Sequence, residues 1–299
     1  MQQLIVIEGA TASGKTALGV ALAQHLNTVV ISADSRQFYK EIAIGTAKPT
    51  VEEMQGVPHY FVDSHSIHEP VSAAQFPQQP MELLPTTLKD YQHNVVVGGS
   101  GLFIDALCIG LDPIPTDTEM QQQLRTELEQ HGLAPLLAEL QATDPAYFNE
   151  VDRANSMRIL RALEVIRSTG KRFSEWRQNK PALRPFSTRR FVIEHPREQL
   201  YSRINQRVDN MLSAGLLDEV KAVYPFKDLA SLQTVGYNEL FTYLNGTADL
   251  KTSIDKIKQH TRNYAKRQLT WFKRHPEAVW IPYNEPKIML QEILQLIDN

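Results

Sequence analysis

Near its N-terminus the chain carries a glycine-rich segment that constrains the fold more than any other feature. Residues 9–16 read Gly-Ala-Thr-Ala-Ser-Gly-Lys-Thr, which fits the G-x-x-x-x-G-K-[ST] spacing of a phosphate-binding P-loop. An apolar run over residues 4–7 precedes the segment, and apolar residues recur at helical spacing over residues 17–26. Because strand, turn and helix are the context in which this motif binds phosphate, the sequence predicts a diphosphate or triphosphate site.

Each fixed position of the motif has a physical role in such a site. Gly9 and Gly14 allow successive N–H groups to turn inward, and the helix that follows adds the partial positive charge of its N-terminus. Lys15 supplies a full charge for the outer phosphates, and the Thr16 hydroxyl is a ligand for Mg²⁺, the expected cofactor. The predicted diphosphate cradle consists of Gly9, Ala10, Thr11, Ala12, Ser13, Gly14, Lys15 and Thr16.

Composition narrows the class of protein. The chain has 299 residues, 42% of them hydrophobic, and a formal net charge of −3, so any nucleic-acid surface must be local. Its single cysteine, Cys108, lies in an apolar run, which we interpret as a buried core position. No apolar run reaches the roughly 18 residues of a membrane span, and no signal peptide precedes the first strand, so we expect a soluble cytoplasmic protein.

Two further apolar runs end in polar or glycine-rich segments. Residues 29–32 lead into Asp34, and residues 94–97 lead into Gly98-Gly99-Ser100-Gly101. Ligands of open α/β sheets bind beyond the carboxyl ends of the strands, so Asp34 is a candidate acid or base, with a helix-capping role as the alternative. Residues 98–101 replace the aspartate with which P-loop NTPases hold Mg²⁺. This replacement favours close approach of the backbone to a ligand over a hydrolytic motor, and a plain tight turn is the alternative.

The pattern becomes helical after a linker at residues 111–118. Helices are predicted over 119–131 and 155–169, each ended by a glycine, and a strand at 190–194 then returns to the sheet. We therefore predict an α/β fold, a P-loop NTPase-like parallel sheet flanked by helices. The predicted core consists of residues 1–115 and 189–299, and the predicted all-helical insertion of residues 116–188.

Several predicted helices carry clustered cations. In the helix over 155–169, Arg158 and Arg161 lie off the apolar stripe, which fits either RNA contact or a solvated face. A helix over 254–274 mixes cations with aromatic residues, which fits phosphate binding and base stacking, with aromatic core positions as the alternative.

A set of segments, taken together and in order, resembles the bacterial tRNA dimethylallyltransferase family. The segments are the P-loop, Ser-Ala-Asp-Ser-Arg-Gln at 32–37, Ile-Gly-Thr-Ala-Lys-Pro at 44–49, Gly-Gly-Ser-Gly-Leu-Phe at 98–103, Arg-Ile-Leu-Arg-Ala-Leu-Glu-Val at 158–165, Thr-Val-Gly-Tyr at 234–237 and Tyr-Ala-Lys-Arg-Gln-Leu-Thr-Trp-Phe at 264–272. They span nearly the whole chain. Each segment alone is a weak indication of the family, but the ordered set is specific for it.

The resemblance implies transfer of the dimethylallyl group of dimethylallyl diphosphate to the N6 amine of the adenosine 3′-adjacent to the anticodon of tRNA. The P-loop then holds a diphosphate, whose departure Lys15, Thr11 and Arg207 would assist while positive charge builds on the allyl carbon. Asp34 matches the general base for the amine. The helical insertion is expected to grip the anticodon stem-loop, and we expect a monomer.

The same resemblance implies a set of tRNA contacts. They are Asp34, Ser35, Arg36, Gln37, Ser100, Gln122, Met157, Arg158, Ile159, Leu160, Arg161, Gln233, Thr234, Val235, Gly236 and Tyr237. Three rival functions stay open from the residues. An isopentenyltransferase acting on free adenylate would not need the insertion, a small-molecule P-loop kinase would leave Asp34 and the 234–237 segment without a use, and a nucleotide-binding module would need no base.

Overall fold

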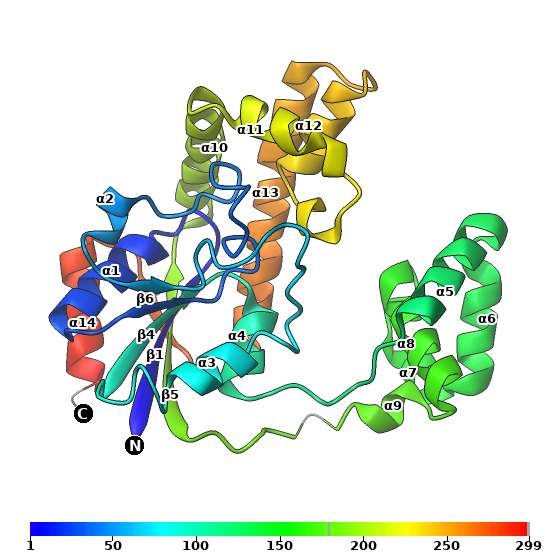
Figure 1. Cartoon of the computed structure of the whole chain (residues 1–299), viewed down its shortest axis with the longest axis horizontal. Helices are drawn as coiled ribbons and strands as arrows, with labels where there is room; N and C mark the ends of the chain where they lie inside the picture. The colour runs from blue at the N-terminus through cyan, green and yellow to red at the C-terminus, as the bar shows by residue number, and fades with distance from the viewer. Residues whose placement is uncertain (179, 298–299) are drawn as a thin grey trace. The chain divides into compact units, whose positions relative to one another are not determined.

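The computed structural model describes residues 1–178 and 180–297 and is built around one parallel sheet (Figure 1). The strand order is β3-β2-β4-β1-β5-β6. The strands are β1 (Gln2–Gly9), β2 (Val30–Ser32), β3 (His59–Tyr60), β4 (His93–Gly98), β5 (Phe186–Glu194) and β6 (Val279–Pro282). In the register, Ile5 of β1 lies opposite Val95 of β4 and Arg189 of β5. The centre of β1 is fully buried, as expected for a parallel strand covered on both faces.

The larger of two compact units comprises residues 1–108 and the chain from residue 183 onward. Helices α1 (Lys15–His25) and α14 (Pro286–Ile297) pack on one face of its sheet, and α3 (Gln78–Leu83) and α4 (Gly101–Cys108) on the other (Figure 1). Its remaining helices are α2 (Val51–Met54), α10 (Arg197–Ser213), α11 (Leu216–Val223), α12 (Tyr237–Leu244) and α13 (Leu250–Phe272), with short 3₁₀ turns at Tyr224–Phe226 and Ala230–Leu232.

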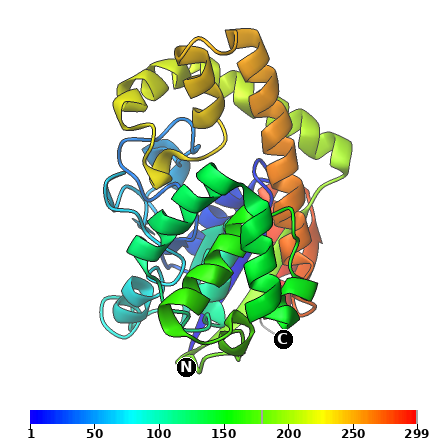
Figure 2. The ribbon, with the colours of Figure 1, turned by 90° about the vertical axis from the view of Figure 1, so that its right-hand side faces the viewer.

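Helix α13 connects two parts of this unit. Asp249 caps its N-terminus by accepting the Thr252 N–H, and its buried positions recur at helical spacing. Ile257 packs with α10, α11 and α12, whereas Ala265 packs against the P-loop. Figure 2 shows α13 as one continuous helix over this length. One rigid element therefore joins the P-loop to the α10–α12 cluster.

The smaller unit, residues 109–182, is helical and has its own apolar core. It contains α5 (Thr118–His131), α6 (Leu133–Thr143), α7 (Pro145–Glu150), α8 (Ser156–Thr169) and α9 (Phe173–Trp176). Gly132 and Gly170, at φ of 74° and 70°, end α5 and α8 as predicted. Arg167 of α8 pairs with Glu127 of α5 at 2.7 Å and Glu139 of α6 at 2.6 Å, which ties three helices together.

The bounds of this unit differ from the predicted 116–188. Residues 183–188 belong with the sheet, because β5 begins at Phe186 and pairs with β1 from its first residue. The Ala182 N–H donates to the Ile109 carbonyl at 2.7 Å, which brings the two ends of the helical unit together. None of the helices within residues 1–178 and 180–297 combines the length and hydropathy needed to cross a membrane.

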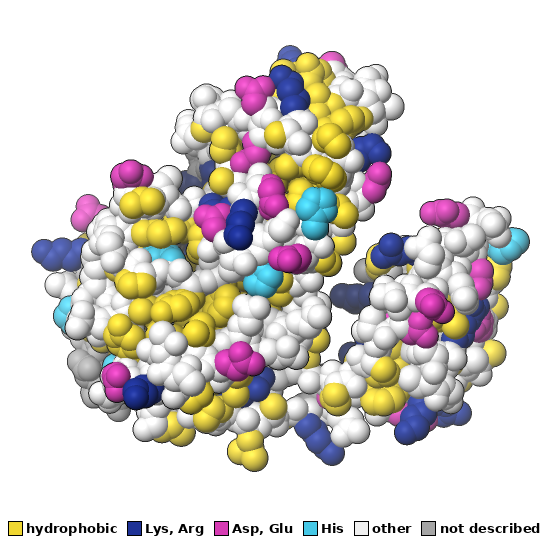
Figure 3. All heavy atoms as spheres, viewed as in Figure 1, with side chains coloured by type: hydrophobic (Ala, Val, Ile, Leu, Met, Phe, Trp, Pro, Cys, Tyr) yellow, Lys and Arg dark blue, Asp and Glu magenta, His cyan; other side chains and the backbone are white. Residues whose placement is uncertain are grey.

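Acidic and basic side chains are interspersed on the face that Figure 3 displays, in keeping with the net charge of −3. A different charge arrangement lies inside the larger unit. Arg190 of β5 is buried and donates to Glu8 of β1 at 2.8 Å and to Asp105 of α4 at 2.9 Å. Burial raises the pKa of Glu8 to about 7, although Arg190 acts in the opposite direction. This buried cluster links two central strands to α4.

We expect Arg190→Met to lower the free energy of unfolding by about 3–5 kcal/mol, because it leaves two buried carboxylates without a cation. A carboxyl group with a folded-state pKa above its unfolded value contributes stability at low pH that is lost as pH rises through the folded pKa. The loss should therefore be smaller at about pH 5 than at about pH 8, measured by urea unfolding. Arg189→Met on the same strand is the control, and equal losses in the two variants would contradict the prediction.

Candidate active site

The P-loop backbone turns twice through the left-handed region. Ala12 and Gly14 have φ of 63° and 92°, in the left-handed region, and the Ser13 N–H donates to the Ala10 carbonyl at 3.2 Å. The Lys15 ammonium donates to that same carbonyl at 2.8 Å. These turns place Lys15 and Thr16 at the start of α1, where an anion also meets the positive end of the helix.

Two side chains that follow the helical unit in the sequence bind carbonyl groups of the P-loop. The Arg203 guanidinium of α10 donates to the Ala12 carbonyl at 2.8 Å, and His195 Nε2 lies 2.9 Å from the Ser13 carbonyl. Because a carbonyl only accepts, this contact places the His195 proton on Nε2, and burial lowers the pKa of the ring. Tyr283 stacks on His195 at 4.0 Å between ring centroids, and its hydroxyl lies 3.0 Å from Arg203.

A cavity of about 430 Å³ opens in front of the P-loop, within the larger unit. Its polar lining includes predicted site residues from four regions of the chain, namely Thr11, Lys15, Thr16, Asp34, Ser35, Arg36, Gln37, Arg207, Gln233 and Thr234. Val235 and Gly236 of the predicted set also line it. An apolar part is formed by Ile204, Val208, Met211, Leu216 and Ile257. The cavity is therefore polar at the P-loop and apolar against α10, α11 and α13.

Four cationic side chains, Lys15, Arg36, Arg207 and Arg267, and the carboxylate of Asp34 line this cavity. Burial lowers the pKa of Lys15 to about 8, opposed by the nearby Asp34 carboxylate and reinforced by Arg207. Burial also lowers the pKa of Arg207. Within the described ranges no hydrogen bond or ion pair engages the Arg207 guanidinium. Its donors are therefore available to an anion held at the P-loop.

The two polar strand ends meet beside this charge cluster. The Asp34 carboxylate accepts the Arg36 N–H at 3.1 Å, and the Ser35 N–H donates to the Ser100 hydroxyl oxygen at 3.0 Å. Tyr264 of α13 lines the same part of the cavity, and burial raises its pKa to about 12 with a further contribution from Asp34. Asp34 thus faces the cavity from a turn fixed by its own oxygen.

The glycines at the end of β4 and just after it allow close packing with neighbouring elements. A Cβ at Gly98 would overlap the Ala33 carbonyl, one at Gly99 would overlap the Gln268 amide, and one at Gly101 would overlap the Trp271 ring. Neighbouring protein groups therefore account for the lack of a side chain at these three positions, while Gly98 also lines the cavity and close approach of its backbone to a ligand stays a prediction.

Two residues predicted to contact tRNA use their polar groups within the protein. Arg36 donates to the carbonyls of Ala230, Ser231 and Gln233 at 3.1, 2.8 and 3.2 Å. Tyr237 is fully buried, and its hydroxyl donates to Glu219 at 2.6 Å. Side-chain contact by Tyr237 is therefore a wrong prediction, because this ring packs against Gly45 and its hydroxyl is satisfied.

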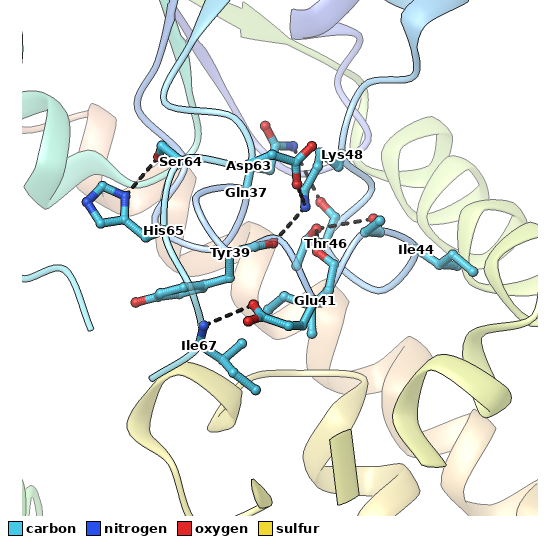
Figure 4. A network of polar contacts seen from close by, with 12 residues as sticks. Gln37, Tyr39, Glu41, Ile44, Thr46, Lys48, Asp63, Ser64, His65 and Ile67 are labelled. Carbon is cyan, nitrogen blue, oxygen red and sulfur yellow. Dashed lines mark hydrogen bonds and ion pairs between the residues drawn. The ribbon is translucent and has the colours of Figure 1, made fainter. Parts of the chain in front are cut away.

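The loop that follows β2 is fixed by a polar network (Figure 4). Gln37 donates to the Ala47 carbonyl at 3.1 Å, and Lys48 donates to the Tyr39 carbonyl at 2.7 Å while pairing with Asp63. Glu219 of α11 accepts three consecutive backbone N–H groups of this loop, at 2.7 to 2.9 Å. The Gly-Thr-Ala-Lys segment therefore shapes the wall of the cavity through its backbone.

Some residues of the helical unit that were predicted to contact tRNA are exposed, and others are buried. Gln122, Met157 and Arg158 are exposed, with Met157 at 60%. Ile159 and Leu160 are buried in the core of the unit, so side-chain contact by these two residues is a wrong prediction that follows from the apolar stripe of α8. Arg161 pairs with the buried Glu164 and donates to the Ile114 carbonyl at 3.2 Å.

The donor set at the P-loop fits Mg²⁺. This ion prefers oxygen ligands and is held in many enzymes by one or two protein groups together with substrate phosphates. The Thr16 hydroxyl lines the cavity beside Lys15 and Asp34. Within the described ranges, no group of three His, Cys, Asp or Glu side chains offers an all-protein metal site. Thr16 with the oxygens of a bound diphosphate would supply the coordination.

Residue type and spacing gave no role to three residues at this site, namely His195, Arg203 and Gln268. Tyr264 belongs to the helix in which aromatic residues alternate with cations, and Gln268 to the 264–272 segment that resembles the family. Arg203 shares a helix with Arg207 at a spacing of four, which was the available signal.

The fold and site define a P-loop α/β protein in which a cationic P-loop opens into a cavity with polar and apolar parts. The sequence model described as IPP transferase matches residues 37–275, and the chain belongs to this family.

The names of similar proteins agree with this family. tRNA dimethylallyltransferase 2 of Parabacteroides distasonis is 44% identical over 99% of this chain and 100% of that protein. tRNA dimethylallyltransferase of Cytophaga hutchinsonii is 46% identical over 93% and 91%. The tRNA isopentenylpyrophosphate transferase structure from Bacillus halodurans superposes with a TM-score of 0.73 at 35% identity, covering 100% of this chain and 96% of that one. A eukaryotic dimethylallyltransferase acting on tRNA gives 0.79 at 26% identity, covering 99% and 78%.

We expect binding of a simple alkyl diphosphate to weaken as pH rises from about 7 to about 9. The last phosphate proton of such a ligand is lost near pH 6, so its charge stays constant, whereas Lys15, with a pKa near 8, loses its charge in this range. Calorimetric titration should show the dissociation constant rising by up to about tenfold per pH unit above the pKa. Lys15→Met should bind weakly without this dependence, and a flat profile for the unaltered protein would contradict the prediction.

Proposed function

We propose that the protein transfers the dimethylallyl group of dimethylallyl diphosphate to the N6 amine of the adenosine 3′-adjacent to the anticodon in tRNA. The observation that carries the proposal is one cavity in which the P-loop, Arg207 and Asp34 face a common space. Membership of the IPP transferase family supports a prenyl diphosphate as donor. The printed names of the relatives support tRNA as acceptor.

In this proposal the cationic cradle stabilises the leaving group. The bond between the allyl carbon and the diphosphate oxygen breaks as positive charge develops on the allyl group and negative charge on the diphosphate. Lys15, Arg207 and the P-loop N–H groups neutralise that charge, and Mg²⁺ held at Thr16 would add electrophilic assistance when bound. Thr11 lines the same edge of the cavity and borders the diphosphate.

Asp34 receives the proton that the amine loses. The N6 lone pair is delocalised into the purine, so a carboxylate that accepts a hydrogen bond from the amine strengthens the nucleophile as the new C–N bond forms. The Arg36 N–H orients one oxygen of Asp34 at 3.1 Å, which leaves the carboxylate able to accept from the substrate. The apolar wall formed by Ile204, Val208 and Met211 suits the five-carbon group.

The helical unit favours tRNA over free adenylate as the acceptor. A small nucleotide would fill the cavity of the larger unit and would need no surface elsewhere. The exposed Met157 and Arg158 of α8, with Gln122 of α5, provide apolar, cationic and polar groups for an anticodon stem-loop. We propose that this unit, residues 109–182, grips the stem-loop while the flipped adenine enters the cavity.

Incubation with unmodified tRNA, dimethylallyl diphosphate and Mg²⁺ tests the proposal directly. Mass analysis of the digested nucleosides should show one dimethylallyl group added to adenosine, and omission of Mg²⁺ should abolish or strongly reduce the gain. Free AMP, incubated in parallel, should gain nothing. A gain on AMP alone would assign the protein to the free-nucleotide transferases, and no gain on either acceptor would contradict prenyl transfer.

We expect Asp34→Asn to reduce the single-turnover rate by about 10²–10⁴-fold, the usual contribution of a general base. Asparagine keeps an oxygen for the Arg36 N–H, so the turn and the affinity for tRNA should be retained, as a filter-binding titration would show. Asp90→Asn, at an exposed position, is the matched control. A rate within a few-fold of the unaltered protein would remove Asp34 from the role of base.

A further inference from the structure

The side chain of Gln268 joins the two loops that border the proposed reaction site. Its Oε1 accepts the Thr11 N–H of the P-loop at 2.9 Å, and its Nε2 donates to the Gly99 carbonyl at 2.7 Å. Because one partner is a donor and the other an acceptor, a carboxamide in this orientation satisfies both at once. Gln268 is only 7% exposed, and Gly99 lacks the Cβ that would displace its amide.

The connection extends to the proposed base. Gly99 is followed by Ser100, whose hydroxyl oxygen accepts the N–H of Ser35, and Ser35 follows Asp34 in the chain. A short path of covalent and hydrogen bonds therefore runs from the P-loop, through the Gln268 amide and the loop after β4, to the turn that carries Asp34.

Helix α13 holds Gln268 in place on both sides along the chain. Ala265, one turn earlier, is fully buried against Ala10 and Ala12 of the P-loop. Trp271, three residues later, donates from its indole nitrogen to Asp105 at 2.7 Å. A side chain fixed on a packed helix has few alternative conformations, so it can set the separation of the two loops.

We propose that Gln268 is a positioning residue that sets the distance between the diphosphate cradle and Asp34. The inference rests on the proposed function, because prenyl transfer needs the allyl carbon and the N6 amine aligned between these two groups. A displacement of about 1 Å can cost on the order of 100-fold in rate. Diphosphate affinity depends on Lys15 and Arg207, so loss of Gln268 should lower the rate of chemistry more than it weakens donor binding.

Kinetics of two variants test this role. Gln268→Leu removes both hydrogen bonds at similar volume, and its single-turnover rate on saturated enzyme should fall roughly ten- to hundredfold, with little change in the dissociation constant for an alkyl diphosphate. Gln268→Glu keeps the acceptor but, when ionised, loses the donor to Gly99. Burial raises the pKa of such a carboxyl, and its protonated form supplies both groups. The rate of Gln268→Glu relative to the unaltered protein should therefore rise as pH falls toward about 5.5.

Gln259→Leu and Gln259→Glu, on the exposed face of the same helix, should leave rate and pH profile unchanged. Thermal denaturation checks folding, and if Gln268→Leu unfolds, the low-pH recovery of Gln268→Glu carries the test. Wild-type rates in Gln268→Leu, or no recovery of Gln268→Glu, would overturn the proposal.

Amide exchange separates this inference from the proposed function. Hydrogen exchange at the Thr11 N–H, followed by NMR, should be slow in the unaltered protein and faster in Gln268→Leu, whatever the acceptor of the reaction. A protein that fails to prenylate tRNA but shows this change would contradict the proposed function and still support the role of Gln268 in joining the two loops. If the protein is active but Thr11 exchanges at the same rate in the unaltered protein and in Gln268→Leu, only the proposed role of Gln268 would be overturned.

Discussion

The P-loop can present its N–H groups to an anion only while its carbonyls are held on the opposite side, and the rest of the larger unit depends on this constraint. Ala12 adopts φ of 63°, a conformation that an alanine keeps only when its surroundings fix it. Arg203 binds the Ala12 carbonyl, His195 binds that of Ser13, and Gln268 fixes the Thr11 N–H. All three come from elements that follow the helical unit in the chain, so the first strand and helix do not form the site alone.

The charges of the unit are arranged so that the cavity is cationic in a chain of net charge −3. Asp34 is the one carboxylate among the described residues that line it, and the lining cations are Lys15, Arg36, Arg207 and Arg267. Glu8, directly before Gly9 in the sequence, would oppose a bound diphosphate if it were an unpaired anion. The buried Arg190 guanidinium compensates the charge of the ionised form, and burial raises the pKa of Glu8, which favours the neutral form.

Local patterns predicted the parts of the fold that depend on neighbouring residues. The P-loop, the apolar runs of β1, β2, β4 and β5, and the glycine-ended helices α5 and α8 follow from short-range spacing, and Asp34 followed from its place after a strand. The start of β5 did not, because residues 186–189 are mostly polar and become a strand through pairing with β1. Arg203, His195 and Gln268 lie more than 180 residues from their P-loop partners, a separation that no local pattern spans.

A motif residue can act by binding a ligand or by shaping the site, and hydrogen-bond accounting distinguishes the two. A polar group already satisfied inside the protein binds a ligand only by giving up that partner, which removes most of the gain. Arg36 and Tyr237 are engaged with protein groups, whereas the Arg207 guanidinium faces the cavity without such a partner among the described residues. Glu239 likewise binds the Gly236 N–H at 2.7 Å. These contacts fix the backbone of residues 233–237, which forms one wall of the cavity.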